Sequence, residues 1–289
     1  MLFYLFSIYL GGIFGISQDF STVSSVVSEN NTLSSSSISE NNVGGIGGQN
    51  ENNSITSNSL TNFNTINSSS SAFSYAASCV AYNKVASTIS NCSSNGNIVS
   101  ALSYKQSAYA GGINASTSFF FFTFYFINLF KDSQSNSLVV NCTSNNNNVA
   151  ASSNLNSLSG GICGEIESSR IFDSTSNRNN ILSQSTETGE SAIAHSGSIS
   201  ATITNKSLVS NCESKNNNVS CINATISLVG GVSGMVNSNS TINSTISSGN
   251  FLFSQSDTNV LGGISGVAQE KLTTFLFVLF SFFFIFFFF

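Results

Sequence analysis

Short stretches in the middle of the chain alternate apolar and polar residues with a period of two. Residues 198–204 read SISATIT. Such alternation is typical of a β-strand with one buried face. Glycine pairs and asparagines between the stretches supply the positive φ that tight corners need. The pattern therefore predicts short strands joined by tight corners, with Ile, Val and Leu facing one interior.

The strongest feature of the sequence is an internal repeat. Residues 160–164 (GGICG) are followed by FDS at 172–174, and residues 230–234 (GGVSG) are followed by INS at 242–244. The offset between the two elements is the same in both copies. Further partial copies of the pattern exist upstream and downstream: VVNC at 139–142, VSNC at 209–212, ISNC at 89–92, and glycine pairs at 44–45, 111–112 and 262–263. Matched spacing over so many positions indicates a repeated structural unit.

The GGICG…FDS and GGVSG…INS segments resemble the GLUG-type glycine-rich repeats of cell-surface proteins. This resemblance covers at most residues 78–269 and implies a β-helical, adhesin-like surface protein. Strands of a few residues with Gly and Asn corners also fit a parallel β-solenoid. Asparagines stacked at equivalent corners could then hydrogen-bond along the axis.

Both ends of the chain are apolar. Residues 2–16 (LFYLFSIYLGGIFGI) indicate a secretory signal peptide with a cleavage point before Gln18, or alternatively an uncleaved anchor. Residues 272–289 (LTTFLFVLFSFFFIFFFF) are long enough for a transmembrane helix. They could instead be a GPI-attachment signal, with Ser265 and Gly266 at the attachment site.

We therefore expect an all-β fold, an irregular parallel β-solenoid (β-helix) with an N-terminal signal helix and a C-terminal hydrophobic helix. The predicted divisions are a signal peptide (1–17), a Ser/Asn-rich and partly flexible region (18–77), a Gly/Asn-rich repeat domain (78–271) and a membrane anchor (272–289). A third apolar run, at residues 119–130, is too short to span a bilayer.

Composition narrows the functional classes. Charged residues make up 7% of the chain, the net charge is −5, and proline and tryptophan are absent. Without a basic patch, nucleic-acid binding is not expected. A neutral, proline-free chain suits stacked strands, because proline removes ladder hydrogen bonds and stacked like charges repel.

The six cysteines allow two interpretations. They are Cys79, Cys92, Cys142, Cys163, Cys212 and Cys221. An even count in an exported chain permits disulfides. However, Cys92, Cys142 and Cys212 occupy equivalent repeat positions, where they could fill one interior column as small side chains. No CxxC pair is present, so we expect no zinc site and no other metal or cofactor.

Glu165, Glu167, Arg170 and Asp173 form the densest group of charges. On a strand, Glu165 and Glu167 would share one face. Paired carboxylates with an arginine could bind calcium or act on a sugar polymer, as in some β-helical lyases and hydrolases. The alternative is solvated charge on a turn that tolerates it. His195, the one histidine, is expected at the surface or in a corner.

These patterns predict a non-enzymatic, membrane-anchored surface protein whose extracellular repeats serve adhesion or coat formation. We expect the membrane, through the C-terminal tail, and glycans or surface proteins as partners. Two alternatives stay open: a β-helical polysaccharide lyase or hydrolase using Glu165, Glu167 and Asp173, and a disordered glycosylated stalk. N-glycosylation sequons begin at eleven asparagines: 30, 52, 67, 91, 114, 141, 205, 218, 223, 239 and 243.

Overall fold

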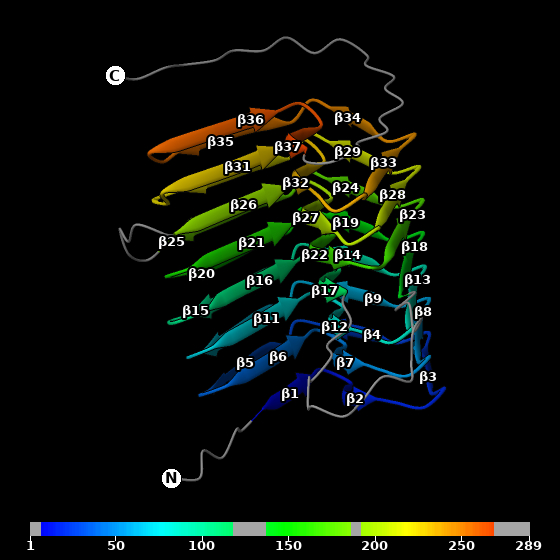
Figure 1. Cartoon of the computed structure of the whole chain (residues 1–289). Coiled ribbons are helices and arrows are strands. Elements are labelled where there is room, and N and C mark those ends of the chain that lie inside the picture. The colour runs from blue at the N-terminus through cyan, green and yellow to red at the C-terminus, as the bar shows by residue number, and fades with distance from the viewer. Residues whose placement is uncertain (1–6, 118–136, 186–191, 269–289) are drawn as a thin grey trace, which may run out of the picture.

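The structure is a computed structural model, and it describes residues 7–117, 137–185 and 192–268. Within these residues the chain is an all-β parallel solenoid built from five sheets. Each turn contributes one strand to every sheet, and the strands of successive turns lie side by side along the axis (Figure 1). We call the sheets A to E in the order in which the chain passes through them. Sheets A and B hold eight strands each, and sheets C, D and E hold seven each, so seven complete turns are followed by a partial one.

The strands are short, and every pair between turns is parallel. Sheet A contains β1 (Ile8–Gly11), β6 (Glu40–Gly44), β11 (Phe73–Ala77), β16 (Ser107–Gly111), β21 (Asn156–Gly160), β26 (Ile193–Gly197), β31 (Ile226–Gly230) and β36 (Thr258–Gly262). Sheet B contains β2 (Phe14–Ser17), β7 (Gly47–Asn50), β12 (Val80–Asn83), β17 (Asn114–Thr117), β22 (Cys163–Glu167), β27 (Ser200–Thr204), β32 (Ser233–Val236) and β37 (Ser265–Ala268). Sheet C contains β3 (Thr22–Ser24), β8 (Ile55–Ser57), β13 (Thr88–Ser90), β18 (Leu138–Val140), β23 (Arg170–Phe172), β28 (Leu208–Ser210) and β33 (Thr241–Asn243).

The last two sheets complete each turn. Sheet D contains β4 (Val27–Glu29), β9 (Leu60–Asn62), β14 (Ser93–Asn95), β19 (Thr143–Asn145), β24 (Thr175–Asn177), β29 (Glu213–Lys215) and β34 (Ile246–Ser248). Sheet E contains β5 (Thr32–Ser37), β10 (Thr65–Ser70), β15 (Ile98–Ser103), β20 (Asn148–Ser153), β25 (Asn180–Ser185), β30 (Asn218–Ile222) and β35 (Phe251–Gln255).

The core has two lobes. The larger lobe lies between sheets B, C and D, and Ile113, Ile162 and Ile199 form one of its columns. The smaller lobe lies between sheets A and E, where Val43 packs with Ile66 and Val99. Each turn alone would leave these aliphatic side chains exposed, and stacking removes them from water. The solenoid predicted from the repeats is therefore confirmed for the described residues, and a stalk without a packed core does not describe them.

A buried row of asparagines runs along the axis after sheet D. In every turn the residue at this position donates its backbone N–H to the side-chain Oδ1 of the asparagine in the next turn. The distances are 2.8 Å from Asn97 to Asn147 and 2.9 Å from Asn147 to Asn179. Its side-chain Nδ2 donates to a carbonyl of the preceding turn, as Asn147 does to Ser94 at 3.3 Å. The predicted asparagine stacking is confirmed, and it satisfies backbone groups that a buried corner would otherwise leave unpaired.

Most turns have glycine at the corner between sheets A and B, because the backbone approaches itself closely there. A side chain at Gly160 would place its Cβ 1.7 Å from the carbonyl oxygen of Cys163. No heavy atom can occupy that space. The Gly-Gly-Ile motif therefore marks a sharp bend, after which the Ile side chain enters the larger lobe of the core.

The N-terminal part of the chain differs from the sequence prediction. Ile8–Gly11 and Phe14–Ser17 are β1 and β2 of the solenoid, where a signal helix was expected. Residues 18–77 continue the same five sheets as strands β3 to β11, so the repeat domain extends upstream of its predicted start. The apolar run at 119–130 and the anchor at 272–289 lie outside the described residues. Within those residues, no helix is long and apolar enough to cross a membrane.

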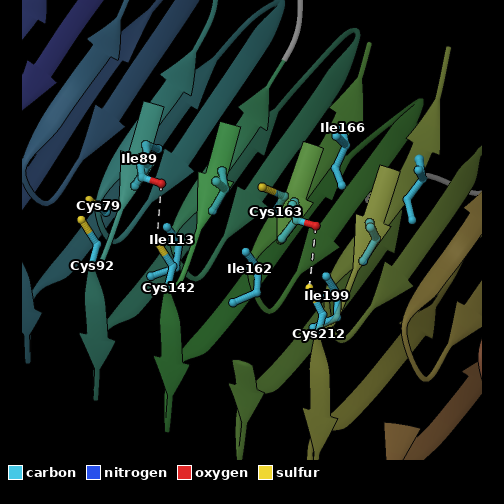
Figure 2. Close-up of a cluster of buried hydrophobic side chains, with 14 of the residues drawn as sticks. Cys79, Ile89, Cys92, Ile113, Cys142, Ile162, Cys163, Ile166, Ile199 and Cys212 are labelled. Atoms are coloured by element: carbon cyan, nitrogen blue, oxygen red, sulfur yellow. Dashed lines mark hydrogen bonds between the residues drawn. The ribbon is translucent and has the colours of Figure 1, made fainter. Parts of the chain in front are cut away.

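All six cysteines are buried and free. Cys92, Cys142 and Cys212 occupy one column at the corner between sheets C and D, as the repeat predicted. Ser174 stands in the same column, since the backbone N–H of Cys142 donates to its Oγ at 3.2 Å. The thiol of Cys142 contacts the carbonyl oxygen of Val140 at 3.3 Å. It also contacts that of Ile89, in the preceding turn, at 3.8 Å (Figure 2). Cysteine and serine therefore perform the same packing role in this column.

Cys142→Ser should change stability little, by about 1 kcal/mol or less. The serine hydroxyl would meet the same carbonyl that the thiol now meets, as Ser174 does with Phe172 at 2.8 Å. Urea unfolding checks this, with Val139→Ser as the comparison, because Val139 is buried in the larger lobe between Ile89 and Ile171 of the neighbouring turns. A loss at Cys142 equal to that at Val139 would contradict the shared role.

Candidate functional site: the A–B corner

The strongest grouping of reactive side chains lies where sheets A and B meet, on the faces turned away from the core. In each turn, one side chain from sheet A faces one from sheet B seven positions later. We call this double row the A–B corner. From the second turn to the seventh its pairs are Asn42 and Gln49, Tyr75 and Tyr82, Tyr109 and Ser116, Leu158 and Glu165, His195 and Thr202, and Leu228 and Met235.

Three tyrosines form a stack in the third and fourth turns of the corner. The ring centroids of Tyr75 and Tyr82 are 5.1 Å apart, and those of Tyr75 and Tyr109 are 4.8 Å apart with nearly parallel planes. Burial is the main reason that the pKa values of Tyr75 and Tyr109 are raised. Lys84 caps the stack, with its Nζ 5.3 Å from the Tyr82 ring centroid, and its ammonium also pairs with Glu51 at 3.7 Å. The phenols therefore remain protonated and act as packing groups.

Glu165 occupies the same corner beyond the tyrosines. It pairs in register with Ser116, whose small side chain stands between Tyr82 and Glu165. Burial raises the pKa of Glu165 to about 7, and the Glu167 carboxylate adds to the shift. The negative charge of Glu165 in turn contributes to the raised pKa of Tyr109. A carboxyl group that titrates near neutrality can donate or accept a proton at physiological pH.

His195 lies within β26 and is buried, so the expected position at the surface is wrong. It is 7% exposed, and its Nδ1 shares a 2.9 Å hydrogen bond with the Oγ1 of Thr202. Burial lowers the pKa of His195 to about 4. The imidazole is therefore neutral at physiological pH and ties sheet A to sheet B.

The predicted carboxylate cluster is only partly brought together. Glu165 and Glu167 do share one face of β22, as expected, and Glu167 accepts a hydrogen bond from the Nδ2 of Asn205 at 2.5 Å. Asp173 lies in the corner after β23, with a φ of 49°, and Arg170 begins β23. Sheet C therefore holds these two residues apart from the Glu165 side chain on sheet B. The carboxylates of Glu165, Glu167 and Asp173 therefore do not converge on one site.

Glu165 gives the protein a pH-dependent stability. The folded pKa of about 7 lies above the ordinary value of 4.5, so the folded state binds more protons between these limits. Stability contributed by this residue is therefore lost as the pH rises from 4.5 to 7. Glu165→Gln should raise the urea midpoint at pH 8 and leave it nearly unchanged at pH 4. Glu213→Gln, at a partly exposed glutamate on sheet D, is the control, and an equal response from both variants would contradict the assignment.

No group of three or more His, Cys, Asp or Glu side chains within residues 7–117, 137–185 and 192–268 could hold a metal ion.

The sequence patterns did not predict the stack of Tyr75, Tyr82 and Tyr109. The signal available for it was the seven-residue spacing on either side of each A–B bend.

Comparisons with known proteins do not assign a family. No family model matches the chain, and no curated protein matches it. The resemblance to GLUG-type repeats is thus not confirmed. One solved structure is similar, a "putative immunoglobulin A1 protease" from Bacteroides ovatus, with a TM-score of 0.49 and 14% identity. The match covers 84% of this chain and 67% of that one. A similarity at this level implies neither a shared activity nor a shared substrate.

Proposed function

We propose that this chain is a non-enzymatic surface protein, exported through its N-terminal apolar segment and held at the membrane by its C-terminal one. Its solenoid would be extracellular and serve adhesion or coat formation. The observation that carries this proposal is the outer surface of sheets D and E. Uncharged hydrogen-bonding side chains of successive turns lie in register there, such as Ser34, Asn67 and Ser100 on sheet E.

Sheet D shows this surface most clearly. Asn62, Asn95, Asn145 and Asn177 follow one another in register on its outer face. Neighbouring strands in a sheet lie roughly 4.8 Å apart, so amide groups repeat at that interval along the axis. Such a row can exchange hydrogen bonds with an extended polar partner such as a glycan chain. Carboxylates are sparse on this face, which disfavours electrostatic recognition of a compact ionic ligand.

The corner asparagines support an exported location. Asn91, Asn141 and Asn223 each begin a sequon, have positive φ and are exposed at corners. The Nδ2 atoms of Asn91 and Asn141 donate to the asparagine of the neighbouring turn at 3.1 and 2.8 Å, and a glycosylated Nδ2 keeps one hydrogen for that bond. Asn114 also begins a sequon but is buried in β17. These positions are compatible with glycosylation of the folded surface at the corners.

Cell-surface exposure is the test. The full chain, with an epitope tag inserted at the 186–191 position between β25 and β26, would be expressed in a eukaryotic host. We expect antibody labelling of intact cells, and release by phosphatidylinositol-specific phospholipase would separate a GPI anchor from a transmembrane helix. Labelling that requires permeabilised cells would reject the proposal.

A second candidate function follows from Glu165, whose pKa of about 7 suits a general acid. This candidate is a polysaccharide lyase or hydrolase. The full chain would be incubated with a panel of polysaccharides and reducing ends or unsaturated products would be measured. Activity that Glu165→Gln abolishes and Glu213→Gln leaves intact would favour the enzyme over the adhesive surface.

A further inference from the structure

The first and the last strands of sheets A and B have nearly the same sequence. Residues 10–16 read LGGIFGI and residues 261–267 read LGGISGV, so five of seven positions are identical. No intermediate turn shares as many of these positions with residues 10–16. In the structure the two segments occupy equivalent places: β1 and β2 begin the solenoid, and β36 and β37 end its described part (Figure 1).

Without residues 1–17, each end of the solenoid would also lack the strands that the other end carries. Sheets C, D and E have seven strands, and sheets A and B have an eighth because β36 and β37 begin a further turn. Removal of residues 1–17 would delete β1 and β2, and the chain would then begin with β3, β4 and β5. One end would supply the A and B strands of a turn, and the other end would supply its C, D and E strands.

We propose that after cleavage before Gln18 the exposed edges of β6 and β7 are covered by β36 and β37 of a second copy. Copies would then stack head to tail along the solenoid axis, which is how the coat would assemble. This inference rests on the export and cleavage proposed above. Its partner is a second copy of this chain, because the interface it forms already exists between β1–β2 and β6–β7.

The existing register shows how the second copy would fit. β1 pairs with β6 so that Leu10 lies opposite Val43 and Gly11 lies opposite Gly44. Leu10 packs against the smaller core lobe that contains Val43. Leu261 occupies the same column at the other end, where it is 47% exposed. In the assembly Leu261 would cover Val43 of the next copy and lose its exposure to water, which favours association.

The polar ladder continues across the same junction. The row of buried asparagines begins at Asn31, whose backbone N–H donates to Asn64 at 2.8 Å, and ends at Asn250, which accepts from Asn217 at 2.8 Å. Stacking would place Asn250 of one copy below Asn31 of the next. The backbone N–H of Asn250 would then donate to the Oδ1 of Asn31, as in every turn within the chain.

Charge does not oppose this contact. Glu40 is the one charged residue among β6, β7, β36 and β37. By the register of sheet A, Glu40 would face Thr258 of the second copy. Natural sheets often place charges on edge strands to prevent such pairing. β7, β36 and β37 carry no such charge, and β1 and β2 cover the edges of β6 and β7 until residues 1–17 are removed.

The test compares the chain with and without residues 1–17. Exported chain would be purified in detergent, its N-terminus identified by mass spectrometry, and its mass measured by light scattering over a concentration series. We expect multiples of the chain mass for protein that begins at Gln18 and a single chain mass for protein that keeps β1 and β2. A single chain mass for the cleaved protein throughout the series would overturn the stacking.

Directed cross-linking tests the register. One cleaved chain would carry Val260→Cys and another Asn42→Cys, and the two would be mixed under mild oxidation. Directly paired residues of neighbouring strands lie at a Cα separation that a disulfide can span. We expect a dimer for this mixture and none when Asn62→Cys, on sheet D, replaces Asn42→Cys. Equal yields in the two mixtures would overturn the proposed register.

A competing peptide supplies a further control. The peptide of residues 8–17 (IYLGGIFGIS) should dissolve the oligomer of the cleaved chain, and the same peptide with Gly11→Val should not. A side chain at Gly11 would place its Cβ 1.9 Å from the carbonyl oxygen of Phe14, so that peptide cannot form the bend. Dissociation by both peptides, or by neither, would contradict the assigned edge.

Exported protein that still begins at Met1 would reject the proposed cleavage without deciding the stacking. A protease site inserted between Ser17 and Gln18 would then produce the cleaved chain in vitro. Light scattering of that protein, after removal of residues 1–17, then tests whether the exposed edges of β6 and β7 pair with a second copy. Oligomers would uphold the complementary ends, and a single chain mass would reject them.

Discussion

Asn147→Ala should destabilise the solenoid by about 3 kcal/mol, because it breaks the buried asparagine row at its centre. The Oδ1 of Asn147 accepts the backbone N–H of Asn97 at 2.8 Å and the hydroxyl of Ser94 at 3.1 Å. Alanine would leave a buried N–H without an acceptor where water cannot enter easily. Urea unfolding would measure the loss, and hydrogen exchange should show faster opening at the flanking turns.

The adjacent residue provides a matched control. Asn146 is exposed and has a φ of 53°, a conformation that glycine adopts without strain. Its side chain donates one hydrogen bond, at 3.1 Å, to Asn95 on the surface. Asn146→Gly should therefore change stability by about 0.5 kcal/mol or less. Equal effects at positions 146 and 147 would show that the buried row does not stabilise the fold.

Ile162→Ala should cost about 2–5 kcal/mol. Ile162 is fully buried in the larger lobe of the core and stacks between Ile113 and Ile199 of the neighbouring turns. Truncation would leave a cavity that rigid ladders on both sides cannot close. The urea midpoint should fall while the slope of the transition stays the same.

Ile98→Ala is the control for this substitution. Ile98 lies on the outer face of sheet E and is 50% exposed. Its truncation removes the same atoms but creates no cavity, so the change should stay within about 1 kcal/mol. A loss at Ile98 as large as that at Ile162 would mean that the outer faces are packed against something in solution.

The solenoid could be predicted from the sequence because a few positions of each turn accept only one or two residue types. Glycine stands at the first position of the bend between sheets A and B in seven of the eight turns, since a Cβ there would meet the backbone, and the column of Asn147 requires an amide that both donates and accepts. These constraints repeat in turn after turn and remain visible in the sequence. Positions on the outer faces carry no such constraint. Because their residues vary from turn to turn, the repeat could not be recognised over its full length.

The region 18–77 was predicted to be partly flexible because serine runs resemble solvated linkers. In the structure both serine runs belong to strands of sheet E, β5 and β10. Their inward-facing members are held by the fold, as Ser68 is by a 2.9 Å hydrogen bond to the carbonyl oxygen of Asn41. The third turn lacks the Gly-Gly-Ile motif, since Ala77, Ser78 and Cys79 occupy the equivalent positions. Alanine and serine fit corners that glycine usually fills, so the sequence pattern weakens while the backbone path is kept.

The candidate site was predictable only within one strand. A period of two places Glu165 and Glu167 on the same face, and the structure agrees. The burial of His195 and the pairing of Tyr75 with Tyr82 depend on how sharply sheet A meets sheet B. That angle comes from packing between sheets, which alternation along a single strand does not encode.

The insertions in the solenoid show how this architecture can change in length. Ladder partners are 33 residues apart between Asn31 and Asn64, 50 apart between Asn97 and Asn147, and 38 apart between Asn179 and Asn217. The longer separations include residues 118–136 and 186–191, and the strands on either side keep their register. Since each turn contacts only its neighbours, duplication of a whole turn would lengthen no existing loop and would leave the entropy of closing every other loop unchanged. Evolution can therefore adjust the reach of this protein in steps of one strand spacing, with a folding problem that stays local at any length.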